Sequence, residues 1–356
     1  MHNGVLHRIA WLLAGPMLFF TLAQAQEPGP EDETINTIRQ LPKIDEGDQR
    51  RIADWVQVKL NKLAATEPEK KAAAAVAFRK TFKTQFENPA NSPAFKAQLA
   101  TQTAVIAAGQ FADAKLDQQT AFGLARVLDD MGGAEATPGF IAGLKSKHDL
   151  VRYHCADGLS KLKPVLAADK AKLDPIVQAL RAQALVETSP VALTRIYLAL
   201  AHNTQVPVVF DAYIAIFEKR LNDRRGGAVK ADGAEVDAFE FFRLPNVLST
   251  LNPDQKAQLA RQLAVFLRLD AERYQTTGLD FYEVDGLERT MEGGEAILVE
   301  ILGAGKGGKV YNEIGAGGQD KRAEVLAETY KWVGHPQSKE PGPLNAAPWN
   351  VPVGAP

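Results

Sequence analysis

The chain has 356 residues, of which 46% are hydrophobic and 24% charged, and its formal net charge is −2. This hydrophobic content is sufficient for a folded core and excludes a wholly disordered chain. The nearly balanced charge provides no basic field for nucleic acid, so we expect no nucleic-acid partner.

The first 25 residues have the pattern of a secretory signal peptide. A weakly positive start precedes a short apolar run over residues 9–22, and Ala23, Gln24 and Ala25 form the small-x-small pattern that signal peptidase cuts. Cleavage is predicted after Ala25, which indicates a periplasmic or secreted protein. The run is shorter than the ~20 residues that span a bilayer, so we expect no membrane insertion after cleavage.

Two regions precede the most informative part of the chain. Residues 26–44 are acidic, hold two prolines near their start and lack an apolar period, so they are predicted to form a mobile leader. Residues 45–133 are predicted to be helical, beginning with Ile52, Val56 and Leu60 on one helix face. This N-terminal helical region is either a set of degenerate repeats or a separate bundle.

Residues 137–163 predict two short amphipathic helices joined by a tight polar turn. Pro138 lies near the start of the first helix, and Asp149 opens the second. The apolar stripe of the second helix comprises Val151, Cys155, Ala156, Leu159 and Leu162. Such a hairpin cannot bury its apolar faces alone, so similar hairpins must stack on either side.

This hairpin resembles a HEAT repeat. The resemblance implies a ladder in which Asp149 and Arg152 bond to equivalent residues of adjacent repeats. The next hairpin has Pro175 near its start and Arg195 in its second helix, but it lacks the turn aspartate, and Ser189 can cap the helix instead.

A third unit begins at Pro207, and the spacing of these prolines falls roughly within the ~34 to 47 residue periods of helical repeats. The predicted fold is therefore all-α, with a right-handed α-α superhelix of HEAT-like hairpins over residues 134–335. An N-terminal helical extension precedes the repeats. The proline-rich residues 336–356 are predicted to form a disordered tail.

The single cysteine, Cys155, excludes an internal disulfide. It lies one helical turn after Val151 and one before Leu159, inside the apolar stripe. An inert, buried thiol is therefore favoured over a reactive or metal-binding one.

The function predicted from this shape is that of an exported scaffold that binds a protein or peptide partner. Stacked hairpins form a concave face lined by the second helix of each hairpin. On the second helix at 149–163, Tyr153, His154, Asp157 and Lys161 are predicted to lie on that face. No catalytic signature is evident, so an enzyme and a cofactor are not expected.

The alternative is a hydrolase that acts in the cell envelope. One version uses His148, His154 and Asp157 as ligands of a metal ion, because two of these residues share a helix face and the third lies near the same turn. Some HEAT-like enzymes bind iron through paired His-Glu dipeptides, but this chain contains no such dipeptide.

Two further patterns have a chemical and a structural interpretation. An acidic cluster comprises Asp280, Glu283, Asp285 and Glu288. It could perform acid and base chemistry on carbohydrate, but Asp280 is predicted to cap a helix instead. Residues 303–310, GAGKGGKV, match a phosphate loop except that Val310 replaces the magnesium-binding hydroxyl, so a glycine-terminated helix is favoured.

Overall fold

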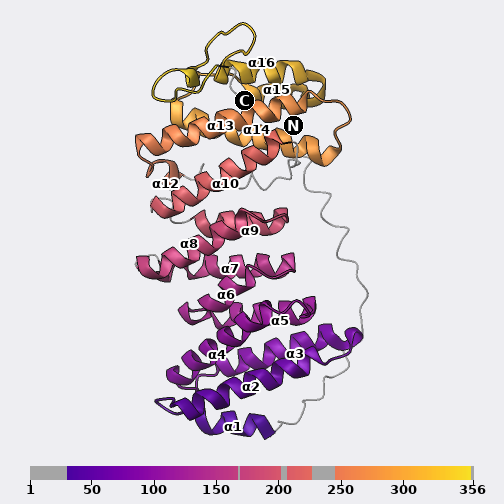
Figure 1. The fold of residues 1–356 in the computed structure, drawn as a ribbon, viewed down its shortest axis with the longest axis vertical. Coiled ribbons are helices and arrows are strands. Elements are labelled where there is room, and N and C mark those ends of the chain that lie inside the picture. Colours follow the sequence, from indigo (N-terminus) through magenta and orange to yellow (C-terminus); the bar gives the residue numbers. More distant parts are fainter. Residues whose placement is uncertain (1–29, 167–168, 202–206, 227–244, 354–356) are drawn as a thin grey trace, which may run out of the picture.

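The computed structural model describes residues 30–353 apart from 167–168, 202–206 and 227–244. The predicted signal peptide and its cleavage site after Ala25 lie outside the described residues. The described chain is all-helical and contains no strand. Its helices stack in chain order from α1 to α16 as an elongated array (Figure 1). The all-α prediction is therefore confirmed.

The N-terminal two thirds of the array consist of two layers. The even-helix layer contains α2 (Glu46–Ala64), α4 (Pro93–Phe111), α6 (Thr137–Gly143), α8 (Lys170–Ala184) and α10 (Pro207–Arg225). The odd-helix layer contains α3 (Pro68–Glu87), α5 (Gln118–Met131), α7 (Asp149–Leu166) and α9 (Pro190–Ala201). Within each layer every helix packs on the next helix of that layer, which buries the apolar faces in one continuous core.

The C-terminal third continues the stack with a different pairing. It contains α12 (Pro245–Leu248), α13 (Pro253–Tyr274), α14 (Phe281–Leu302), α15 (Val310–Gly317) and α16 (Arg322–Val333). Short 3-10 turns lie at Ala134–Ala136 (η1), Gly318–Lys321 (η2) and Pro343–Asn345 (η3). Helix α13 packs on α10, α14 and α16, so it joins the array to its C-terminal end.

The predicted hairpin at residues 137–163 is present as α6 and α7. All five side chains of the predicted stripe, Val151, Cys155, Ala156, Leu159 and Leu162, are at most 4% exposed. Helix α7 packs on α5 and α9, its neighbours in the odd-helix layer. The stripe is therefore sealed between adjacent hairpins, as the sequence predicts.

The predicted leader differs from the structure over residues 30–44. Residues Pro30–Ile38 form α1, which packs on α2 through the buried Ile35 and Ile38. Asp32 accepts a hydrogen bond from Trp55 Nε1 at 2.8 Å. Two isoleucines one helical turn apart are enough to dock a short helix, although the segment is acidic.

The predicted disordered tail also differs from the structure, up to residue 353. Leu344 is fully buried, and Asn345 donates to the carbonyl oxygens of Val333 and Val351. Arg261 of α13 donates to Trp349 O at 2.7 Å. The prolines prevent a regular helix in this segment, but they do not prevent its apolar side chains from packing on α13 and α16.

Candidate functional site

The four residues predicted to bind a partner lie together on α7, between α5 and α9. Lys161 Nζ lies 2.6 Å from Asp129 Oδ1 of α5 and 3.0 Å from Asp157 Oδ2. Asp157 Oδ1 in turn lies 3.4 Å from Arg195 Nη1 of α9. The charges on this face are therefore paired with one another, and they link three helices of the odd-helix layer.

Aromatic contacts complete this network. The Arg195 guanidinium lies over the Tyr153 ring, 4.9 Å from its centroid. The His154 ring contacts the rings of Phe122 and Tyr153 at centroid distances of 4.9 and 5.1 Å. Burial lowers the pKa of His154, and the nearby positive charge of Arg126 lowers it further. These contacts link α5, α7 and α9 within the protein.

The predicted ladder takes a different form from the one that the HEAT resemblance implies. Arg152 forms a bidentate pair with Glu187 in the turn between α8 and α9, with donor to acceptor distances of 2.7 and 2.6 Å. Asp149 accepts only the N–H of its neighbour Leu150 in the described structure. Arg195 lies on α9 and pairs with Asp157, outside the turns.

Glu187 is a structural residue that the sequence interpretation missed. Its carboxylate also accepts the backbone N–H of Ser189 at 2.9 Å and the side chain of Gln183. Burial would raise its pKa, but the hydrogen bonds from Arg152 and the other donors outweigh burial and leave the pKa lowered. In the sequence, Glu187 lies two positions before Ser189, the predicted helix cap, and this spacing is the signal that could have indicated its structural role.

The metal-binding alternative is wrong in its ligand set. His148 Nε2 lies 3.0 Å from the carbonyl oxygen of Leu116, whereas His154 packs among aromatic rings. Among the described residues, no three His, Cys, Asp or Glu side chains converge closely enough to bind a metal ion. The two histidines therefore have separate structural contacts and do not form a metal site with Asp157.

The acidic cluster around residue 283 is divided among structural roles. Asp280 caps α14 by accepting the N–H of Glu283 at 2.9 Å, and Glu283 accepts the N–H of Asp280 in return. Glu288 accepts the Tyr274 hydroxyl, and Asp285 lies 3.9 Å from Arg289. The predicted capping role of Asp280 is confirmed, and each of the four carboxylates has a structural contact of its own.

In the glycine-rich loop before α15, the backbone N–H groups that could bind a phosphate are bound by the side chain of Glu295. Glu295 of α14, which is buried, accepts the backbone N–H groups of Val310 and Tyr311 at 2.8 and 2.7 Å. It also accepts Trp332 Nε1 at 2.8 Å. A phosphate would need these same N–H groups at the helix N-terminus, so the loop is structural.

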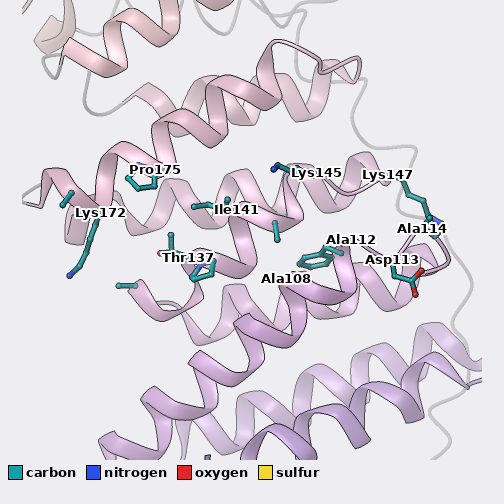
Figure 2. A pocket seen from close by; sticks show the side chains of 15 residues that line it. Ala108, Ala112, Asp113, Ala114, Thr137, Ile141, Lys145, Lys147, Lys172 and Pro175 are labelled. Atoms are coloured by element: carbon teal, nitrogen blue, oxygen red, sulfur yellow. The ribbon is translucent and has the colours of Figure 1, made fainter.

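A groove opens on the even-helix layer, between α4 and α8, with α6 as its floor (Figure 2). Its volume is about 920 Å³, within the ~300 to 1,000 Å³ range of ligand-binding pockets. Small and apolar side chains line most of it: Ala108, Phe111, Ala112, Ala114, Ala134, Pro138, Ile141, Ala142, Ala171 and Pro175. This is a preformed, mainly apolar surface.

Close helix packing explains why the groove exists. A Cβ added at Gly139 would lie 3.2 Å from Ala104 Cα of α4, and one at Gly143 would lie 2.2 Å from Cys155 Sγ of α7. One at Gly158 of α7 would lie 2.4 Å from the Phe140 ring. These three glycines let α6 sit deep against α4 and α7, below the outer surface of the layer.

Polar groups surround the groove. Figure 2 shows Lys172 at one end and Lys147 with Asp113 at the other, and Lys145 lies between them, in the turn after α6. The Thr137 hydroxyl also lines the groove and is buried without a hydrogen-bond partner among the described residues. The sequence interpretation did not identify this site.

Comparison of the chain with models of known protein families, with curated proteins and with solved structures found no match. In the part of the chain that the structure describes, every helix is too short or too polar to cross a membrane.

Proposed function

We propose that this protein is an exported helical-repeat scaffold and that it binds a polypeptide partner in the groove between α4, α6 and α8. The groove is the observation that supports this proposal most directly. It is preformed, mainly apolar and open along one layer of a stacked array, a shape suited to polypeptide segments. The charged groups on α7, by contrast, are already paired within the protein.

The finer features of the proposal extend the resemblance to HEAT repeats. The two alternating layers and the Arg152–Glu187 pair, which joins one hairpin to the turn of the next, support a HEAT-like array. A right-handed superhelical path of that array is part of the proposal. Export to the periplasm or the medium is proposed from the signal-peptide pattern of the first 25 residues.

The face formed by Tyr153, His154, Asp157 and Lys161 is a second candidate surface for a protein partner. The stacked pair of Tyr153 and Arg195 favours it, because both residue types are enriched in interface hot spots. A partner at this face must add contacts to charged groups that are already paired within the protein. This requirement makes the groove the better candidate.

Selection from a peptide display library tests the proposed function. The purified mature protein is the bait, and the variant Ala142→Trp is used for counter-selection, because a tryptophan on the floor should fill the groove. Ala77→Trp, on the exposed face of α3, is the matched control. We expect peptides that bind the wild type and Ala77→Trp but not Ala142→Trp. Equal binding of all selected peptides to the three proteins would refute the groove as the site.

A further inference from the structure

We infer that the groove between α4, α6 and α8 accepts an amphipathic α-helix with an acidic flank from a partner protein. This inference rests on the proposed function and specifies the chemistry of the partner. Three properties of the groove support it: the lengths of its helices, the size of its lining side chains and the charges at its rim.

The lengths of the three helices leave room for a helical occupant. Helix α4 has 19 residues and α8 has 15, whereas α6 between them has only 7. At ~1.5 Å per residue these lengths are about 28, 22 and 10 Å. The three residues of η1 precede α6 and pack on α4, but η1 and α6 together are still shorter than either neighbour. A partner helix laid along this gap would pack on both walls.

The lining side chains are suited to large apolar groups on the partner. Six of the lining residues are alanines: Ala108, Ala112, Ala114, Ala134, Ala142 and Ala171. Small side chains leave holes between them, and leucine, isoleucine or phenylalanine side chains of a partner can enter such holes. A helix supplies them at positions i, i+4 and i+7 on one face.

The rim carries an excess of positive charge. Lys145, Lys147 and Lys172 surround the groove, and Asp113 is the one acidic lining residue. No described side chain pairs with Lys145, and Lys147 Nζ donates to the carbonyl oxygen of Ala114 instead of a carboxylate. Lys172 Nζ lies 3.2 Å from Asp169 Oδ2, and the two side chains are 63% and 43% exposed. Glutamate or aspartate beside the apolar face of the partner would complement this rim.

The distribution of lysines around the groove favours a helix over a fatty acid as the occupant. The groove is partly open to solvent, and lysines lie at both of its ends and between them (Figure 2). A fatty acid has one carboxylate and would leave most of this positive rim unpaired. An acidic helix can place several carboxylates along both walls.

A labelled peptide tests this inference directly. The probe is a fluorescein-labelled peptide of about four helical turns, with leucines at i, i+4 and i+7 and glutamates on the flanks. One control peptide has lysine in place of each glutamate, and another has a proline in its centre, which breaks the helix. Fluorescence anisotropy with the mature protein measures the dissociation constant of each peptide, and laurate is added as a competitor.

The acidic probe should bind at least about tenfold more tightly than either control peptide. The variant Lys145→Glu/Lys172→Glu should weaken binding of the probe about tenfold or more. The variant Lys80→Glu/Lys83→Glu, with both changes on exposed α3 positions, should leave it nearly unchanged. Thermal unfolding and circular dichroism of both variants check that the fold is retained.

Three outcomes would overturn the inference. They are equal binding of the lysine-flanked or proline-containing peptide, no effect of the groove lysines, and laurate binding more tightly than any peptide. Failure of the proposed function is a separate result: no display peptide would then distinguish Ala142→Trp from the wild type. Groove-dependent peptides that are basic or extended would preserve the proposed function and reject the acidic helix.

Discussion

Arg152 of α7 and Glu187 of the α8–α9 turn form a bidentate ion pair whose carboxylate is completely shielded from solvent. Arg152 also donates to the carbonyl oxygen of Ser146 at 2.9 Å, in the turn before its own helix. One guanidinium therefore ties together the turns of two successive hairpins. This connection fixes the spacing of α7 and α9 in the odd-helix layer.

Replacing Arg152 with methionine should lower the free energy of unfolding by about 3 kcal/mol, because Glu187 would remain as a buried charge without its partner. Urea denaturation of the purified protein measures this loss. The double variant Arg152→Met/Glu187→Met should be more stable than Arg152→Met alone, since it removes both charges. A loss under about 0.5 kcal/mol for Arg152→Met would contradict the structural role of the pair.

Gly143 in the closely packed α6 and Gly109 on an open face of α4 should respond in opposite ways to substitution by alanine. Gly143→Ala should cost about 1 to 3 kcal/mol, because its Cβ would lie 2.2 Å from Cys155 Sγ and would push α6 away from α7. Gly109→Ala in α4 is the control, since a Cβ there meets no atom within 4 Å. That substitution should stabilise the protein by about 0.5 to 1 kcal/mol. Equal effects in chemical denaturation would show that α6 is not packed so closely.

The helices and the buried stripe of α7 could be predicted from the sequence, because hydrophobic spacing and caps are local signals. Val151 and Leu159 are both fully buried, as their spacing predicts. The groove could not be predicted in this way. It depends on how deeply α6 sits among its neighbours, and the close contacts of Gly139 and Gly143 appear only once the helices are packed.

The role of the α7 polar face could be predicted only in part. The spacing of His154, Asp157 and Lys161 places them on one face, but it does not reveal that Asp129 and Arg195 lie on the flanking helices. Asp129 lies 32 residues before its partner Lys161, and Arg195 lies 38 residues after its partner Asp157. Local spacing therefore cannot show either pair. The face that sequence alone presents as free is therefore internally paired.

The lowered pKa of His154 predicts a pH dependence of stability. Because burial disfavours the protonated ring, the unfolded chain binds more protons at this residue than the folded protein does. Stability should therefore be highest above the ordinary histidine pKa of about 6.5, fall as the pH drops below that value, and level off below the lowered pKa.

Urea midpoints of the wild type and of His154→Gln between pH 8 and about pH 5 measure this dependence. The variant should lose less stability than the wild type over that interval, because its side chain does not titrate. The carboxylates whose pKa is lowered, such as Glu187, affect stability only at more acidic pH. Identical pH profiles for the two proteins would rule out the effect.

Glu295 of α14 binds the N-terminus of α15, and this contact predicts both a stability effect and a lack of nucleotide binding. Glu295→Ala should destabilise the protein by about 3 kcal/mol, because the N–H groups of Val310, Tyr311 and Trp332 lose their acceptor. Glu300→Ala, an exposed change on the same helix, should stay within about 0.5 kcal/mol of the wild type.

Magnesium ATP should not raise the melting temperature of the wild-type protein, because Glu295 already occupies the N–H groups that a phosphate needs. Differential scanning fluorimetry with and without the nucleotide provides this measurement. An increase in melting temperature that grows with nucleotide concentration and is lost in Lys309→Ala would show instead that the loop binds nucleotide.

The most direct test of the groove as a binding site is NMR of alanine methyl groups during titration with the acidic helical peptide. The account predicts that the methyl signals of groove alanines, such as Ala108, Ala142 and Ala171, shift on binding. The signals of Ala73 and Ala77, on the exposed face of α3, should stay in place. Shifts confined to α3 or to the face of α7 near Tyr153, with the groove methyl signals unchanged, would contradict it.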